Sequence, residues 1–147
     1  STIRRDSVDV FFQSYSTATN LLLSTLQFGD GMANDTSGPI LSGTNNRLYI
    51  GSTTPGEYQT GAKSDAGLLQ NDAVLSGITS ETITSSVVVP SIIDWHRQFG
   101  SVNQDKMIDL NLFGDFKLLT LSSEFDGGSE RYILEPFNLS GESLLVP

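Results

Sequence analysis

His96 is the only histidine of the chain, and Asp94 precedes it by two residues. On a strand this spacing places both side chains on one face, within reach of each other. Together with one of the many serines they would supply the groups of a Ser-His-Asp hydrolase. That chemistry also needs a serine on a strained turn and an oxyanion hole, and the G-x-S-x-G motif is absent. We therefore interpret His96 as a half-buried residue at a strand end and predict that the chain is not an enzyme.

Two groups of side chains carry the oxygen ligands that calcium prefers. Neither group has the ordered spacing of a calcium-binding loop. No pair among the 17 acidic residues has the apolar setting that would raise one pKa for glycoside hydrolysis, and the lack of cysteine excludes thiolate metal sites. We interpret these groups as solvated turn residues and expect no metal and no cofactor. They are Asp30, Asn34 and Asp35, and Asp105, Asp109 and Asp115.

The charge balance narrows the classes of partner. The chain of 147 residues has a formal net charge of −9, which repels phosphate backbones and disfavours nucleic-acid binding. Arg4 and Arg5 form the only adjacent basic pair. No segment is apolar and long enough to span a bilayer, so no membrane partner is expected. The N-terminus lacks the apolar core of a signal peptide, which favours synthesis in the cytoplasm.

The stretch from Lys106 to Phe137 has the clearest strand pattern. Ile108, Leu110 and Leu112 alternate with polar residues, which predicts three aliphatic side chains on one face of a strand. Gly114-Asp115 is typical of a two-residue hairpin loop, and Asp126-Gly127-Gly128-Ser129 predicts a second turn. The stretch is thus predicted to be a three-stranded antiparallel meander.

The rest of the chain has shorter and less certain patterns. Segment 8–12 alternates as a strand does, whereas the leucines of segment 17–28 favour a short helix slightly over a strand. Segment 29–46 is rich in turn residues and is predicted to be a long loop with one short extended piece, which in a compact domain is typically functional or held by a neighbour. Segment 48–50 is predicted to be a short strand.

Three further apolar runs follow. Segment 68–78 fits a helix and a strand equally well. Val87-Val88-Val89 is predicted to be a buried strand that Pro90 either ends or pushes to a sheet edge, and Leu144-Leu145-Val146 a last strand. We predict an all-β fold, an antiparallel β-sandwich or barrel-like domain with long loops and at most one or two short helices. Residues 1–6 are expected to be a flexible N-terminal arm, and residues 7–147 a single β-rich domain.

Segment 44–52, with the sequence TNNRLYIGS, resembles the N-[RK]-L-Y-I-G stretch of structural proteins of tailed bacteriophages. The resemblance covers about a fifteenth of the chain and brings no catalytic residue with it. It implies a virion context, in which a small acidic β-domain coats the capsid surface after assembly in the host cytoplasm. Many proteins of this kind are homotrimers that clamp neighbouring subunits of the major capsid protein.

Such a decoration or cement protein would bind the head, or other virion proteins, through its loops and its terminal arm. Met32, Ile40 and Leu41 of the long loop would bury apolar surface in a neighbour. Arg4 and Arg5 would pair with an acidic capsid surface. The expected assembly contacts are therefore Arg4, Arg5, Met32, Ile40, Leu41 and Tyr49.

Other functions fit the sequence as well. Within virions, a tail or head-to-tail connector component is the alternative. A carbohydrate-binding module would stack sugar rings on exposed aromatic side chains, although large aromatic residues more often fill a core. An enzyme with a pocket around His96 is a third hypothesis. The candidate aromatic residues are Tyr15, Tyr49, Tyr58, Trp95 and Tyr132.

Overall fold

A computed structural model describes residues 9–29, 34–56 and 70–145 of the chain. In this part the structure consists of strands joined by turns and contains no helix, so the all-β prediction is confirmed. The predicted arm of residues 1–6 lies outside the described residues. The strands are β1 (Val10–Tyr15), β2 (Leu22–Phe28), β3 (Thr36–Ser42), β4 (Arg47–Thr54), β5 (Asp72–Thr79), β6 (Thr82–Thr84), β7 (Val87–Val89), β8 (Ile92–Phe99), β9 (Gln104–Phe113), β10 (Lys117–Phe125) and β11 (Glu130–Asn138).

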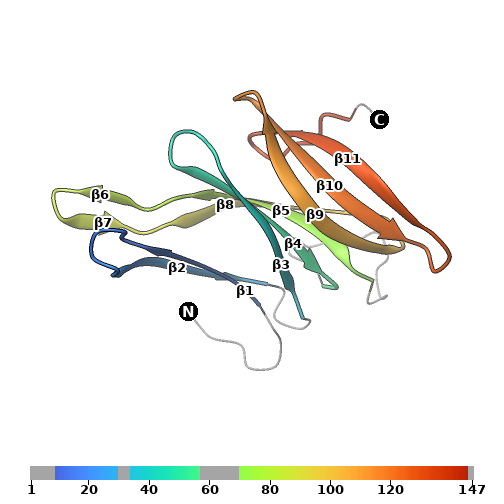
Figure 1. Cartoon of the computed structure of the whole chain (residues 1–147), viewed down its shortest axis with the longest axis horizontal. Coiled ribbons are helices and arrows are strands. Elements are labelled where there is room, and N and C mark those ends of the chain that lie inside the picture. The colour runs from blue at the N-terminus through green and yellow to red at the C-terminus, as the bar shows by residue number, and fades with distance from the viewer. Residues whose placement is uncertain (1–8, 30–33, 57–69, 146–147) are drawn as a thin grey trace.

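These strands form four antiparallel sheets (Figure 1). A four-stranded sheet in the order β3-β4-β5-β8 lies in the middle, and the meander β11-β10-β9 packs on one side of it. The hairpins β1–β2 and β6–β7 are separate two-stranded sheets, and both project from the end of the molecule that lies away from the meander (Figure 1). The arrangement is sandwich-like, as predicted.

The middle sheet is buried on both faces. On one face Tyr49 and Leu75 pack against Leu110 and Leu118 of the meander. On the other face Ile50 packs with residues of β1 and β2. Since neighbouring residues of a strand point to opposite faces, burial of both Tyr49 and Ile50 requires a layer on each side. This explains why β4 and β5 contain long buried runs instead of an alternating pattern.

The meander predicted for 106–137 is confirmed as β9, β10 and β11. Its first strand contains a bulge, because Ser122 pairs with Met107 and Leu121 with Asp109, which leaves Ile108 as an extra residue. Ile108 is consequently exposed while Leu110 is buried, so the prediction of three aliphatic side chains on one face is wrong. The β9–β10 loop has three residues instead of two, and Gly114 adopts the expected positive φ.

The predicted helix in segment 17–28 is wrong, because β2 pairs antiparallel with β1 over most of this segment. The turn between them contains Asn20 with φ 55°, a left-handed conformation that asparagine tolerates. Phe28 is buried in the cluster beneath the middle sheet and Leu26 packs against it. Burial of this face stabilises the strand over the weak helical preference of the leucines.

Segment 29–46 contains a full strand, β3, so the prediction of a long loop with one short extended piece is also wrong. β3 lies at the edge of the middle sheet, and its register shifts between Ser37 and Ile40. An edge position and a bulge are the places where a strand accepts a proline such as Pro39. The turn into β4 has positive φ at both Asn45 and Asn46.

Three remaining predictions are resolved by the sheets. Segment 68–78 is a strand from residue 72 onward, and residues 68 and 69 lie outside the described part. Val87–Val89 forms a strand, but its side chains are exposed, so the prediction of a buried strand is wrong. Leu144 and Leu145 form no strand. The adjoining Ser143 makes an isolated bridge with Phe137, and the Leu144 N–H donates to the Pro136 carbonyl at 2.8 Å.

Candidate functional site

His96 lies on β8 opposite Ser76 of β5. Its Nδ1 is 2.7 Å from the Ser76 hydroxyl oxygen, and its ring packs 5.5 Å from that of Phe28, between centroids. Burial lowers the pKa of the His96 imidazole, so the ring is neutral at neutral pH. The Ser76 side chain is completely buried and has no access to a substrate. This serine–histidine pair therefore joins two strands instead of supplying a nucleophile.

Asp94 binds other groups than the expected histidine. It is the extra residue of a bulge, because Gly77 pairs with Trp95 and Ile78 with Ile93. Its Oδ2 accepts hydrogen bonds from Arg47 Nη1 at 3.0 Å and from Thr79 Oγ1 at 2.7 Å. Asp94 is thus in an ion pair with Arg47 of β4, and the hydrolase arrangement considered from the Asp94–His96 spacing is not assembled.

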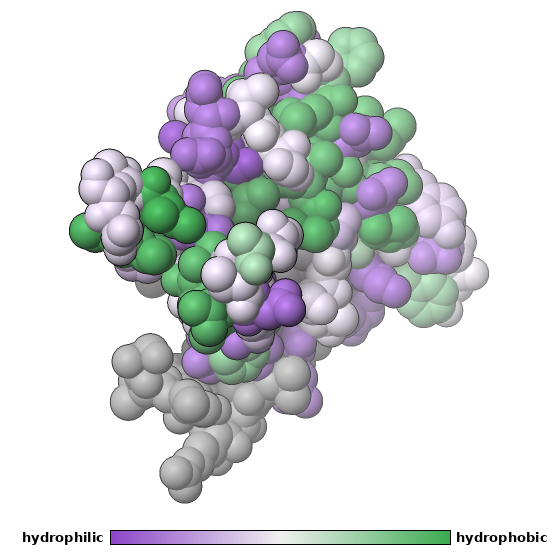
Figure 2. Space-filling view, turned by 60° about the vertical axis from the view of Figure 1, so that its left-hand side comes forward, coloured by the Kyte–Doolittle hydropathy of each residue, from purple (hydrophilic) through white to green (hydrophobic). Residues whose placement is uncertain are grey.

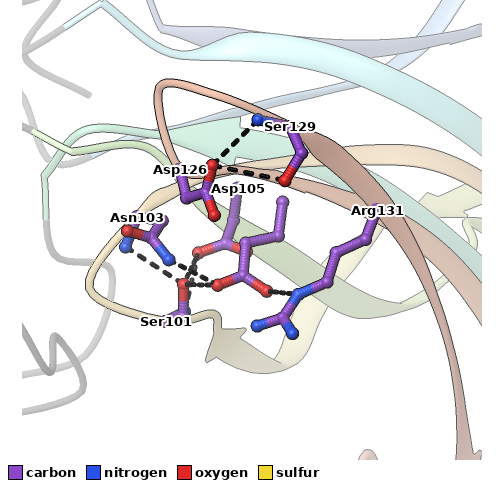
Figure 3. A network of polar contacts seen from close by, with 7 residues as sticks. Ser101, Asn103, Asp105, Asp126, Ser129 and Arg131 are labelled. Atoms are coloured by element: carbon purple, nitrogen blue, oxygen red, sulfur yellow. Dashed lines mark hydrogen bonds and ion pairs between the residues drawn. The ribbon is translucent and has the colours of Figure 1, made fainter.

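A second polar cluster surrounds Glu124, which is almost completely buried near the end of β10 (Figure 3). Arg131 Nε donates to its Oε2 at 2.5 Å, and Asn103 Nδ2 and Ser101 Oγ donate to Oε1 at 2.6 and 2.7 Å. The Ser101 N–H also donates to Oδ2 of the buried Asp105 at 2.6 Å. The network connects the β8–β9 turn with β9, β10 and β11.

The electrostatics of this cluster identify its role. The hydrogen bonds from Arg131, Asn103 and Ser101 lower the pKa of Glu124 to about 2. A general acid needs a raised pKa and a general base one near neutrality, so this carboxylate fits neither task. Nearby, backbone N–H groups of Ser129 and Gly128 donate to Asp126 and lower its pKa as well. We interpret the cluster as a structural clamp on the end of the meander.

The groups of oxygen ligands are not brought together. In the described ranges no set of three or more histidine, cysteine or acidic side chains is placed to hold a metal ion. Asp35 is buried, whereas Asp109 and Asp115 are exposed and Asp105 belongs to the Glu124 network. Asp30 lies outside the described residues.

The structure describes three of the six expected assembly contacts. Ile40 is exposed on the edge strand β3, and Leu41 is partly buried against the core. Tyr49 has only 1% of its surface exposed, so its selection as a contact residue is wrong. Arg4, Arg5 and Met32 lie outside the described residues.

The aromatic residues proposed for sugar stacking are likewise dispersed. Tyr15 and Tyr132 are exposed, but they lie on β1 and β11, which belong to different sheets. Tyr49 fills the core. Trp95 packs so closely on two glycines, Gly77 and Gly141, that an added Cβ at either would overlap its ring. Tyr58 is outside the described part.

A feature that the sequence analysis missed is the surface of the two projecting hairpins. Residues 10–28 and 82–93 contain no charged residue and no histidine. Figure 2 turns this end of the molecule toward the viewer and shows hydrophobic side chains gathered on it. We call residues 10–28 and 82–93 together the hairpin lobe. The sequence itself shows that both segments lack charged residues. The sequence analysis nevertheless assigned the valine run to the core.

Comparison with known proteins adds no relative. No protein-family model matches the sequence, and no curated protein matches it. Within residues 9–29, 34–56 and 70–145 there is also no helix with the length and hydropathy needed to cross a membrane.

Proposed function

We propose that this chain is a non-enzymatic structural protein of a virion, a decoration protein that binds and stabilises a phage head. The observation that carries the proposal is the amount of exposed apolar surface on a sandwich whose polar clusters at His96 and Glu124 hold parts of the fold together. Exposed apolar side chains that gather on one part of a protein are typical of a surface that another macromolecule covers. The chain would thus act by binding.

The expected partner is the major capsid protein, or another protein of the virion. The edge strand β3 supports this, because one of its edges pairs with no other described strand and it has an exposed apolar side chain, Ile40. A free strand edge can pair with a strand of a neighbouring protein. The N-terminal arm with Arg4 and Arg5 would add contacts to an acidic surface. We propose a homotrimer as the unit that binds.

A binding experiment tests the function. The purified chain, fluorescently labelled, is mixed with heads of the phage whose genome encodes it, and the heads are separated by gradient sedimentation. We expect the label to sediment with the heads up to a saturating ratio. Ile40→Lys should weaken this binding, whereas Phe113→Lys, at an exposed apolar residue of β9 outside both β3 and the hairpin lobe, should not.

Three outcomes would contradict the proposal. A coding sequence that lies outside any viral genome removes the virion context. Label that stays at the top of the gradient removes the head as partner. Label found by electron microscopy on tails instead of heads would replace the decoration protein by the tail or connector component.

A further inference from the structure

The hairpin lobe is unusual in its composition. At the chain average of 17% charged residues, two segments of this combined length would carry roughly five charged side chains, yet they carry none. The rest of the chain consequently holds the whole net charge of −9. A surface loop that only faces water has no reason to avoid charge, whereas a surface that becomes buried does, since burying an unpaired charge is costly.

The β6–β7 hairpin carries exposed apolar side chains on both of its faces, next to two threonines on one of them. Ile83 and Val88 are cross-strand partners and therefore share one face, whereas Val87 and Val89 lie on the other. Ile83 is 59% exposed, Val87 62% and Val89 52%. A strand pair that packs on its own core shows the alternation of one apolar and one polar face. Two apolar faces require a neighbour on each side.

A tight turn and hydrogen bonds at the base define the geometry of the projecting hairpins. Ser85 and Ser86 both have positive φ, 49° and 68°, as in the tight type I′ turn whose twist matches that of the strands. At the base of the lobe the Ser91 N–H donates to the buried Ser24 hydroxyl of β2 at 2.9 Å, and Ser91 Oγ donates to Glu81 at 2.9 Å. The first bond ties the base of β6–β7 to β2, and the second joins the two ends of the β6–β7 segment, so both hairpins leave the same end of the molecule (Figure 1).

The distribution of charge indicates which kind of partner can bind the hairpin lobe. Two copies of the chain, each with a net charge of −9, repel each other wherever their acidic surfaces meet. The hairpin lobe is the part where copies can approach without facing or desolvating a charge. A nucleic acid or an anionic membrane would find no basic side chain there. A second copy of this chain is therefore the partner that fits.

The exposed area is sufficient for such a contact. Nine large apolar side chains of the lobe, each at least 40% exposed, offer on the order of 800 Å², which is what each partner buries in a standard interface. In a closed ring of three subunits every subunit has two neighbours, so it divides this area between two contacts, one on each face of β6–β7, and the three subunits together bury about 2,400 Å². The side chains are Phe11, Tyr15, Leu21, Leu22, Ile83, Val87, Val88, Val89 and Ile92.

We infer that three copies of the chain associate through their hairpin lobes around a threefold axis, with β6–β7 of each copy between the lobes of its neighbours. The inference deepens the proposed function, because it names the surface through which the homotrimer forms. It rests on the self-association in that proposal and is independent of attachment to a head.

The test is the mass of the full chain in solution, measured by analytical ultracentrifugation over a range of concentrations. We expect three times the 15.9 kDa of one chain. The double substitutions Val87→Lys/Val89→Lys and Ile83→Lys/Val88→Lys place charges on the two faces in turn. Each should raise the dissociation constant about 100-fold or more, since each would bury charges without partners.

A matched control separates this surface from apolar exposure in general. Phe113→Lys changes a side chain that is 66% exposed on β9, outside the lobe, and should leave the trimer intact. Fluorescence of the single tryptophan, Trp95, checks that each variant is folded. Lysine is used because it reduces the net negative charge, so dissociation of the lysine variants would not arise from added repulsion between copies.

Each other result would overturn the inference. These results are a monomer at all concentrations, a trimer that survives both double substitutions, and a dimer that responds to one of them only. A monomer that floats with neutral phosphatidylcholine vesicles would assign the lobe to a lipid surface instead. A wild-type chain that binds heads but stays a monomer at every concentration would remove this inference and leave the decoration function standing.

Discussion

At the scale of single residues, the buried carboxylate of Glu124 contributes most directly to holding the meander together. Three donors from two segments converge on it: Ser101 and Asn103 of the β8–β9 turn, and Arg131 of β11 (Figure 3). Arg131 is largely exposed, so solvent weakens the ion pair itself. The hydrogen bonds within the buried part of the cluster are therefore the main source of stability, because breaking them would leave polar groups unsatisfied.

We predict that Glu124→Gln lowers the free energy of unfolding by about 1–3 kcal/mol at neutral pH, because charge-assisted hydrogen bonds are lost. The pKa of Glu124 is about 2 in the folded chain, below its ordinary value of 4.5. The folded state thus favours the ionised form, and this stabilisation is present above pH 4.5 and lost as the pH falls toward 2. Urea unfolding of both proteins at several pH values measures the difference.

The difference between wild type and Glu124→Gln should therefore shrink between pH 4.5 and 2. Glu130→Gln is the control, since Glu130 is exposed at the start of β11 and should leave the unfolding free energy nearly unchanged. A difference that is constant over this pH range would show that the side-chain shape, and not its ionisation, stabilises the clamp.

A second prediction at this scale concerns Gly77, which lies on the buried strand β5 opposite Trp95. A Cβ at residue 77 would lie 2.6 Å from Cζ2 of the Trp95 ring, and Gly141 packs closely on the same ring, which limits how far the ring can move away. We expect Gly77→Ala to cost about 1–3 kcal/mol of unfolding free energy, as overpacking of a core does. Urea unfolding followed by Trp95 fluorescence gives this value.

Gly128→Ala serves as the control for Gly77→Ala. The nearest atom to its added Cβ is Asp126 Oδ1 at 3.7 Å, an ordinary contact, and its φ is not in the left-handed region. This variant should unfold at nearly the wild-type urea concentration. Equal losses in both variants would mean that glycine flexibility, and not contact with Trp95, explains the result.

At the scale of elements, burial divides the strands into a rigid centre and projecting parts. β4 and β5 are buried along most of their length between the meander and the β1–β2 hairpin. Among the strands that the structure describes, β6 and β7 pair only with each other. An isolated two-stranded hairpin is marginally stable in water, so its amide groups open more often than those of a central strand.

Hydrogen exchange followed by mass spectrometry tests this division. Amides of β5 should exchange slowest in the chain. Amides of β6–β7 should exchange fast in the dissociated lysine variants and at least about tenfold more slowly in the associated wild type, because a neighbour then covers the hairpin. Fast exchange of β6–β7 in an associated wild type would mean that the contact between copies lies elsewhere.

At the scale of the whole molecule, an acidic body is joined to an uncharged lobe. The copies in a trimer bring three net charges of −9 close together, and repulsion between them opposes association. Salt screens this repulsion, while it leaves the burial of apolar side chains nearly unaffected at moderate concentration.

We therefore predict that self-association becomes stronger when salt is raised from about 20 mM to about 300 mM, as the Debye length shortens. The dissociation constant from analytical ultracentrifugation should fall several-fold. Measurements in sodium chloride and in potassium chloride provide the control for a specific ion effect. A dissociation constant that rises with salt would indicate that ion pairs, and not the uncharged lobe, hold the copies together.

The sequence by itself determined the all-β class and the meander, because turn residues and period-two alternation agree in segment 106–137. The charge-free segments of the lobe are also visible in the sequence alone. These features are local, or sums over a segment, and need no knowledge of neighbours. The prediction that no hydrolase site forms around His96 used the same kind of information, the absence of a required motif.

Only the tertiary structure decided the rest. Local patterns assume one buried face and a constant period, whereas β4 and β5 are buried on both faces and bulges at Ile108 and Asp94 interrupt the period. β2 became a strand because β1 and the middle sheet bury its apolar face. The Glu124 clamp joins residues far apart in the chain, so its partners depend on how the strands pack. Side-chain burial is a property of the assembled layers, and for that reason the valines of β7 gave the pattern of a core and lie on the surface.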